Sequence, residues 1–322
     1  MKIQNIKTDQ IDQTDQTFGY TFNRDGEQLE ASIRKMGVLQ PVKLQPISET
    51  SLYRIITGFQ RVQTANKLKI KEIPAIVFDE QGPKTLDFFT QSIHENSLTR
   101  IFNPVEIALA LSKLVQQFQV PENDIVENYF PLLGLGKNNR LLSRYLQILE
   151  LDESIKIALA ADLLGIEMAQ RLTELSEADR KLIFSVFESL KLGKNRQREI
   201  LNFFRDIANL KEVSYVQIGH QINLDKILND ESLQTPLKTE AIRTALYRLR
   251  YPRLSEVETK YQEIIKRLKV PASVKIVPFP FFEETRFSVQ FNFRNQAELQ
   301  KRVKALSRMA DDPAVDELTK LT

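Results

Sequence analysis

Three short segments near the start of the chain carry side chains that could bind a nucleotide. Gly58-Phe59-Gln60-Arg61 stands between a β-branched segment at 53–57 and a helix-like pattern that begins at once. A glycine turn between a strand and a helix presents free backbone N–H groups and a positive helix end to an anion. Gly58 would let the backbone approach a phosphate, and Arg61 could hold two of its oxygens. Gln40-Pro41 belongs to the second segment.

The third segment holds Glu95, Asn96 and Arg100. Glu95 and Asn96 offer oxygen ligands suited to a Mg²⁺ ion that bridges a triphosphate, so they are the candidate catalytic and metal-binding residues. Arg100 lies one helical turn beyond Asn96 and could reach the same phosphates. Taken singly, Arg61 could form a surface salt bridge, and Glu95 with Asn96 could be a helix end. The order of the three segments favours a nucleotide site over these alternatives.

Glu106 has a different interpretation. Asn103-Pro104-Val105-Glu106 is typical of a helix N-terminus, with Asn103 as the cap, proline at the first position and glutamate at the third. Capping is therefore the expected role of Glu106.

Composition indicates a soluble globular protein with more than one domain. The 322 residues exceed one ordinary core, and 42% of them are hydrophobic and 27% charged. The absence of cysteine excludes disulfides, thiolate metal sites and a cysteine nucleophile. No apolar run approaches the ~20 residues of a membrane helix, and the N-terminus lacks a signal-peptide core. The net charge is +3, so nucleic-acid binding would depend on local clusters.

Strand and helix patterns alternate in residues 1–80 and predict a small α/β domain. Helices are expected at 27–36, ending at Gly37, and at 59–68. Strands are expected at 2–6, 42–44, 53–57 and 73–78. From 85 to about 250 the pattern is helical, apart from a polar segment at 214–236 that is expected to be a linker or loosely helical.

The last part of the chain predicts an α-β-β-α unit. Its expected helices are 255–268 and 296–309, and its expected strands are 274–277 and 286–293. Because two antiparallel strands leave open edges, the unit is expected to pair with a second copy and form a homodimer. The aromatic run at 279–282 is expected to be a hairpin tip that folds onto the dimer core, rather than an exposed contact patch.

A helix-turn-helix is predicted from helices at 125–130 and 137–149. The outward face of the second helix carries residue types that read base edges or hold phosphates, although an ordinary exposed helix face has a similar composition. The candidate DNA contacts on it are Lys137, Asn138, Asn139, Arg140, Ser143 and Arg144. Lys194, Arg196 and Arg198 form a cluster without an acid and are candidates for further phosphate contacts.

The three nucleotide-binding segments, in this order, resemble the N-terminal domain of the ParB family. The resemblance rests on Ser32 to Pro41, on Gly58 to Arg61 with Ala65, and on Glu95 to Glu106. Residues 136–149 are similar to the family's recognition helix, and 255–309 to its dimerisation domain. The implied fold class is a multidomain α+β protein. Its domains are a nucleotide-binding domain at 1–100, an all-α helix-turn-helix domain at 101–250 and a dimerisation domain at 254–322.

This resemblance implies a dimeric DNA clamp that binds and hydrolyses CTP with Mg²⁺ in the prokaryotic cytoplasm, associated with the nucleoid. Double-stranded DNA would be its partner, and DNA segregation, nucleoid organisation or transcription control its role. Gln40 and Pro41 would lie beside the nucleoside. Gly58, Arg61 and Arg100 would hold the phosphates, together with the turn residues Phe59 and Gln60.

The chain departs from the family pattern in several places. Phe59 and Gln60 replace the glutamate and first arginine of the usual Gly-Glu-Arg-Arg turn, which leaves CTP hydrolysis uncertain. The connector 131–136 is longer than the usual turn. Gln170 and Arg171, also candidate DNA contacts, end a segment that stands where the family commonly has Gly-His-Ala-Arg, so the standard centromere site is not assumed. The first strand begins almost at once, without the leader that engages a ParA-type ATPase, so that partner is doubtful.

Two other functions stay open at this point. One is a DNA-binding regulator whose N-terminal domain has lost nucleotide binding, as Phe59 and Gln60 suggest. The other is a nucleotide-dependent kinase or nuclease on the same ParB/sulfiredoxin-like scaffold. The helical and dimerisation regions disfavour the second, because a free-standing enzyme would not need them.

Overall fold

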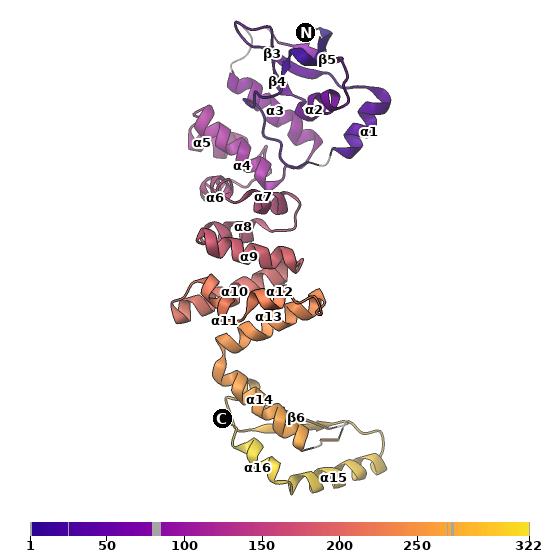
Figure 1. Cartoon of the computed structure of the whole chain (residues 1–322), viewed down its shortest axis with the longest axis vertical. Helices are drawn as coiled ribbons and strands as arrows, with labels where there is room; N and C mark the ends of the chain where they lie inside the picture. Colours follow the sequence, from indigo (N-terminus) through magenta and orange to yellow (C-terminus); the bar gives the residue numbers. More distant parts are fainter. Residues whose placement is uncertain (1, 25, 79–84, 269, 272–273, 322) are drawn as a thin grey trace. The chain divides into compact units, whose positions relative to one another are not determined.

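A computed structural model describes residues 2–24, 26–78, 85–268, 270–271 and 274–321 (Figure 1). The chain forms two units, residues 1–180 and 181–322. The three predicted domain ranges do not coincide with these units and stay a prediction. Within the described residues, no helix combines the length and apolar character needed to span a membrane.

A five-stranded sheet forms the centre of the N-terminal unit, in the order β1-β5-β3-β4-β2. The pairs β1–β5 and β3–β4 are antiparallel, whereas β3–β5 and β2–β4 are parallel. The predicted strands are confirmed to within two residues, and the short β2 was not predicted. The strands are β1 (Ile3–Lys7), β2 (Ile11–Asp12), β3 (Val42–Pro46), β4 (Tyr53–Thr57) and β5 (Glu72–Val77).

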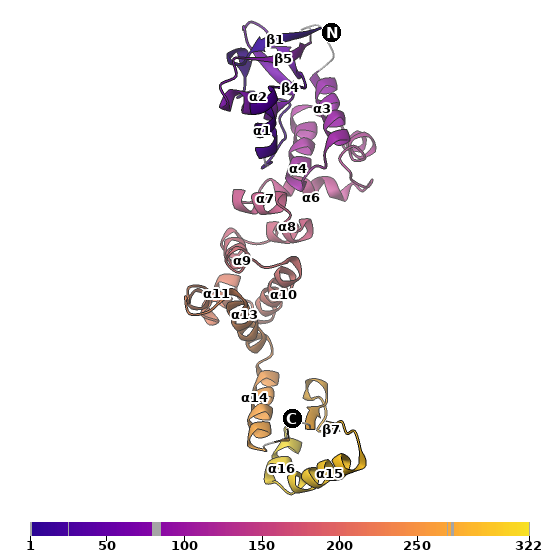
Figure 2. The same ribbon diagram turned by 90° about the vertical axis from the view of Figure 1, so that its right-hand side faces the viewer.

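Helices cover both faces of this sheet. α1 (Glu27–Met36) and α2 (Phe59–Lys67) lie on one side, and α3 (Thr85–Thr99) lies on the other (Figure 2). Val62 of α2 packs in the core with Val42 and Leu44 of β3. Because successive side chains of a strand point to opposite faces, Lys43 points toward α3.

The helix that follows α3 begins where the sequence predicts. In α4 (Pro104–Ser112), the Asn103 side chain accepts hydrogen bonds from the backbone N–H groups of Val105 (3.1 Å) and Glu106 (2.9 Å). Glu106 in turn accepts one from the Asn103 N–H (3.1 Å), which confirms the predicted cap. The unit continues with α5 (Glu122–Asp124), α6 (Arg140–Ile148), α7 (Glu153–Ala160) and α8 (Ile166–Thr173).

Both predicted helices of the helix-turn-helix need correction. The segment 125–130 is a π-helical turn, Ile125–Tyr129, that continues α5. The second helix starts at Arg140 and not at 137. Asn138 accepts a hydrogen bond from the Arg140 N–H (3.1 Å), a local side-chain contact that holds the preceding residues in a turn.

The second unit begins within α9 (Glu177–Ser189) and is helical up to α14. The segment 214–236 is helical, as one of the two predictions had it, and is not a linker. Ser214 and Gln217 form a capping box that starts α11, and Ile218 and Leu224 are buried. After α9, the helices of the second unit are α10 (Lys194–Lys211), α11 (Tyr215–Gln221), α12 (Leu224–Leu228), α13 (Thr235–Arg250) and α14 (Pro252–Arg267).

The predicted α-β-β-α order of the C-terminal residues is confirmed. β6 (Val274–Pro278) pairs antiparallel with β7 (Phe287–Phe291), and α15 (Gln296–Ala310) and an unpredicted α16 (Pro313–Thr319) follow. At the hairpin tip, Phe282 packs against Tyr261 and Phe287. Phe281 is 73% exposed, so one phenylalanine of the tip folds inward and its neighbour does not.

Candidate nucleotide-binding site

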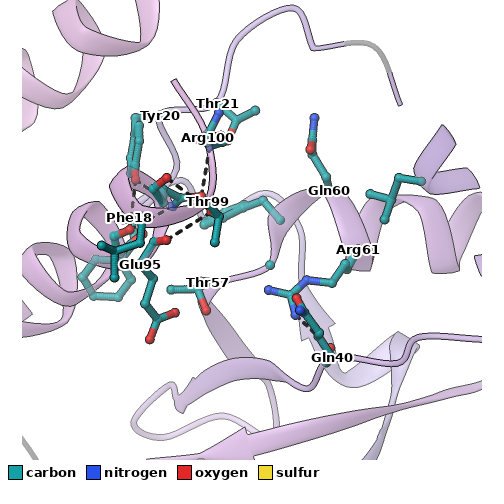
Figure 3. A pocket seen from close by; sticks show the side chains of 16 residues that line it. Phe18, Tyr20, Thr21, Gln40, Thr57, Gln60, Arg61, Glu95, Thr99 and Arg100 are labelled. Atoms are coloured by element: carbon teal, nitrogen blue, oxygen red, sulfur yellow. Dashed lines mark hydrogen bonds between the residues drawn. The ribbon is translucent and has the colours of Figure 1, made fainter. Parts of the chain in front are cut away.

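A cavity of about 470 Å³ lies between the start of α2 and the C-terminal half of α3 (Figure 3). Nucleotide sites are typically clefts of several hundred Å³, so this volume suits such a ligand. The three predicted segments converge here although they are far apart in sequence. The predicted residues that line it are Gln40, Gly58, Phe59, Gln60, Arg61, Glu95, Asn96 and Arg100.

Gly58 makes the turn between β4 and α2. It is the N-cap residue of α2 and has a left-handed backbone, with φ 101° and ψ 23°. A Cβ on Gly58 would lie 2.8 Å from Cγ1 of Val42, closer than packed carbon atoms approach. No side chain caps this end of α2, and the first N–H groups of a helix lack partners within the helix. The turn is therefore suited to an anion.

Arg61 lies beside this turn, and backbone carbonyls hold it. Its Nη1 donates to the carbonyl oxygens of Gln40 (2.8 Å) and Pro41 (3.0 Å). Nη2 and Nε lie 3.1 and 3.2 Å from the point where a Cβ on Gly58 would sit. Burial lowers the pKa of Arg61, and the negative charge of Glu95 opposes this shift. Pro41 thus contributes to the site through its carbonyl.

Glu95 forms an ion pair with Lys43 of β3, a residue that sequence reasoning did not select. The Lys43 and Glu95 side chains are 18% and 39% exposed. One signal in the sequence could have identified Lys43. It stands between the apolar residues Val42 and Leu44, which are buried, and this alternation places the lysine on the opposite face of the strand.

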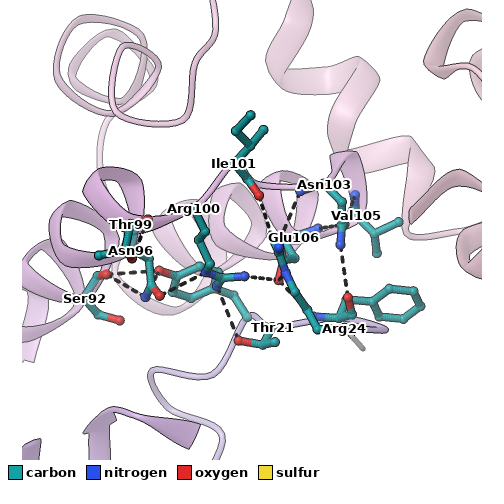
Figure 4. Close-up of polar contacts among 12 residues, drawn as sticks. Thr21, Arg24, Ser92, Asn96, Thr99, Arg100, Ile101, Asn103, Val105 and Glu106 are labelled. Carbon is teal, nitrogen blue, oxygen red and sulfur yellow. Dashed lines mark hydrogen bonds and ion pairs between the residues drawn. The ribbon is translucent and has the colours of Figure 1, made fainter. Parts of the chain in front are cut away.

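Asn96, Arg100 and Glu106 form a hydrogen-bonded network at the end of α3 (Figure 4). Arg100 Nε donates to Asn96 Oδ1 (3.0 Å), and Arg100 Nη1 donates to Glu106 Oε1 (2.5 Å). Asn96 Nδ2 donates to the Tyr20 hydroxyl (2.8 Å) and to the Ser92 carbonyl (2.9 Å). The amide of Asn96 is therefore held on both sides.

Glu106 is 0% exposed and also accepts a hydrogen bond from Arg24 Nε (3.0 Å). It thus serves as a cap and as the shared partner of Arg24 and Arg100. Sequence reasoning missed Tyr20 and Arg24, because they meet α3 and α4 from a distant irregular segment that carries no local signal.

The first 96 residues match a known family. The family description "ParB N-terminal domain" covers residues 1–96, which hold β1–β5, the Gly58 turn and Glu95 with Asn96. The N-terminal domain of the chain belongs to the ParB family. The predicted family is thereby confirmed.

Several ParB proteins resemble the chain over part of its length. It is 30% identical over 181 residues to the probable chromosome-partitioning protein ParB of Coxiella burnetii, covering 54% of this chain and 59% of that protein. It is 29% identical over 151 residues to the probable chromosome-partitioning protein ParB of Pseudomonas putida, covering 47% of this chain and 49% of that protein. The chain therefore spans about half of the length of these curated relatives.

A solved ParB structure is also similar. It is the C-terminally truncated chromosome-partitioning protein ParB of Caulobacter crescentus, complexed with CTP-γ-S. The sequence identity is 23%, the TM-score is 0.26, and the match covers 56% of this chain and 98% of the other.

The predicted DNA-reading residues of the chain lie on and before α6. Leu142, Tyr145 and Ile148 are buried, and the predicted contact residues of this segment are exposed. Lys137 forms an ion pair with Glu127. The exposed residues are Lys137, Asn138, Asn139, Arg140, Ser143 and Arg144.

The other predicted DNA contacts differ from one another in their exposure to solvent. Gln170 and Arg171 of α8 are half-buried. Lys194, Arg196 and Arg198 lie in the first turns of α10, in the second unit, and are exposed. Arg196 pairs with Glu199, which also binds Arg243. Their role at DNA stays a prediction.

Proposed function

We propose that this ParB-family chain binds CTP in the cavity at Gly58 and acts as a sequence-specific DNA clamp in chromosome or plasmid partition. The observation that carries the proposal is the convergence of Gly58, Arg61, Glu95 and Arg100 on one cavity. Two relatives are named as chromosome-partitioning proteins, and CTP is the nucleotide that the ParB resemblance implies. A cytoplasmic, nucleoid-associated location would follow from this role.

The phosphates would meet two donors side by side. The N-terminus of α2 offers backbone N–H groups, and Arg61 lies beneath the same turn. Because Nη1 makes both bonds to the carbonyls of Gln40 and Pro41, those bonds fix the guanidinium and leave its other edge toward the Gly58 turn. A fixed guanidinium loses little freedom when it binds a phosphate.

The proposal covers CTP binding and not its hydrolysis. Both predicted metal ligands already have cationic partners, Glu95 through Lys43 and Asn96 through Arg100. Across the residues that the structure describes, no cluster of three or more His, Cys, Asp or Glu could hold a metal. The residues therefore do not fit a Mg²⁺ site in this arrangement, and we derive no step through the ion.

Arg61→Ala should lower the affinity for CTP by about a hundredfold, because a charge-assisted contact to phosphate is lost. Isothermal titration of the full-length protein with CTP, in the presence and absence of its DNA, measures the change. Arg34→Ala is the matched control, since Arg34 is exposed on α1 and bonded to Glu30.

Unchanged affinity of Arg61→Ala would show that the phosphate site is misplaced. If the wild type gives no heat with CTP, ATP or GTP, the chain is the second candidate, a DNA-binding regulator without a nucleotide. The replacement of two charged turn residues by Phe59 and Gln60 is the observation that favours that candidate.

For DNA, we propose that α6 reads the sequence in the major groove. Arg140→Ala should lower specific binding by about tenfold, because one base-reading contact is typically worth ~1–3 kcal/mol. The probe is a duplex that the wild type enriches from a random pool, and fluorescence anisotropy gives the affinity. Lys7→Ala, at an exposed position of β1, is the control. Equal binding by Arg140→Ala and the wild type would exclude α6 as the reader.

The C-terminal residues would hold two copies of the chain together. None of the residues of α15, all of which the structure describes, is buried, and Val303 on this helix is 52% exposed. Val289 of β7 and Phe293 beyond it are also exposed. A second copy would cover these apolar side chains and the edges of the two-stranded sheet. Analytical sedimentation of the wild type, Arg140→Ala and Lys7→Ala measures the mass of each protein in solution. A monomeric wild type would refute the proposed dimer.

A further inference from the structure

The Lys43–Glu95 ion pair lies beside the proposed phosphate site and is not part of the predicted set. Lys43 reaches Glu95 from β3 across 52 positions of sequence. The β3–β4 pairing is irregular between Lys43 and Leu44, and such irregularities re-aim a side chain. The partner of Lys43 in the register is Thr57, which itself lines the cavity.

The charge of Glu95 would oppose a nucleotide if nothing balanced it. Glu95 lines the cavity, as does Arg61 on α2 (Figure 3). A triphosphate carries several negative charges, and like charges this close repel each other strongly in a partly desolvated site. Lys43 neutralises the carboxylate in contact with it. The pair therefore performs the charge compensation for which Glu95 would otherwise need a divalent cation.

We propose that the Lys43 ammonium replaces a divalent cation at Glu95, so that the cavity binds a nucleoside triphosphate without metal. This inference rests on the proposed nucleotide site. Lysine is a compact point charge that suits phosphate and carboxylate alike. Its position is fixed by the strand and by Glu95, so the compensating charge is present before the nucleotide enters.

CTP binding by the full-length wild type, measured by isothermal titration, should change less than about threefold between buffer with MgCl₂ and buffer with EDTA, because no metal is needed. Lys43→Met should bind at least about tenfold more weakly in EDTA, because Glu95 then faces the phosphates unpaired. Added Mg²⁺ should restore most of this loss, since Glu95 becomes free to hold the ion.

The double variant Lys43→Met/Glu95→Gln separates charge compensation from a structural role. It removes the unpaired carboxylate, so it should regain binding in EDTA and gain little from Mg²⁺. Lys67→Met is the control, because Lys67 forms an exposed ion pair with Glu30 in the same domain. Thermal melts of all variants check that each is folded.

The outcomes distinguish the two proposals. If the wild type binds CTP with Mg²⁺ and loses it in EDTA, the role of Lys43 is refuted and the nucleotide site stands. If the wild type binds in neither buffer, both proposals fall. Equal binding by wild type and Lys43→Met in EDTA refutes the role of Lys43. A loss in Lys43→Met that neither Mg²⁺ nor the double variant restores would assign Lys43 a structural role and also refute it.

Discussion

Glu106→Ala should lower the stability of the N-terminal unit by about 3–5 kcal/mol, the usual cost of breaking a buried ion pair by removing one partner. The carboxylate is inaccessible to solvent and accepts hydrogen bonds from Arg24, Arg100 and the Asn103 N–H. Its removal would leave two guanidinium groups without their shared partner and α4 without half of its capping box. Hydrogen exchange of the full chain, read in peptides from 85–112, measures the change.

Glu30→Ala is the matched control for this variant. Glu30 also pairs with two cations, Arg34 and Lys67, but their side chains are 66% and 70% exposed. Water and salt screen such pairs, so this variant should exchange nearly like the wild type. Equal protection in Glu106→Ala and Glu30→Ala would show that the buried network does not stabilise α4.

The contribution of Glu106 to stability should depend on pH. Burial acts to raise the pKa of Glu106, but hydrogen bonds from Arg24 and Arg100 outweigh it and lower the pKa below its ordinary value. A lowered folded-state pKa stabilises the fold above the unfolded pKa of about 4.3, and this contribution is lost as pH falls through the folded pKa. The stability difference between wild type and Glu106→Gln should therefore be largest near neutral pH and shrink in acid.

Local signals in the sequence predicted most of the elements. The helix 27–36 was recognised from the spacing of its apolar residues and from Gly37, which follows its last residue. In the structure, the Gly37 N–H donates a hydrogen bond to the Ile33 carbonyl (2.9 Å). Asn103 and Glu106 defined the start of α4 because a capping box involves neighbouring residues. The start of α6 was wrong by three residues, because the turn at Asn138 contains polar residue types that a helix face also carries.

The candidate site was predictable in its segments and not in its contacts. Gly58, Arg61, Glu95 and Arg100 were selected from local motifs, and the fold brings them to one cavity. Lys43 and Arg24 escaped selection because each meets its partner through the sheet or an irregular segment far away in sequence. Strand order and register decide such encounters, and neither follows from the pattern of a single segment.

Gly58→Ala should destabilise the N-terminal unit by about 2–5 kcal/mol, through backbone strain and overpacking together. The residue has φ 101°, where a Cβ is unfavourable, and the added methyl would lie 2.8 Å from Val42 Cγ1 in the core. Relief of the clash would move the turn away from β3. CTP binding should therefore fall below detection, because the N-terminus of α2 and Arg61 would no longer meet the phosphates together.

Gly37→Ala separates the two causes of this effect. Gly37 also has a positive φ, 72°, but a Cβ there would meet no atom within 4 Å. Its ψ of −173° places it in a region that is essentially restricted to glycine, so Gly37→Ala should cost about 1–3 kcal/mol from strain alone and leave CTP binding unchanged. Hydrogen exchange and calorimetric titration of both full-length variants give the comparison. If Gly58→Ala costs less than about 2 kcal/mol, the close approach to Val42 is absent in solution. If Gly58→Ala is destabilised but binds CTP normally, the turn supports the fold and does not hold the phosphates.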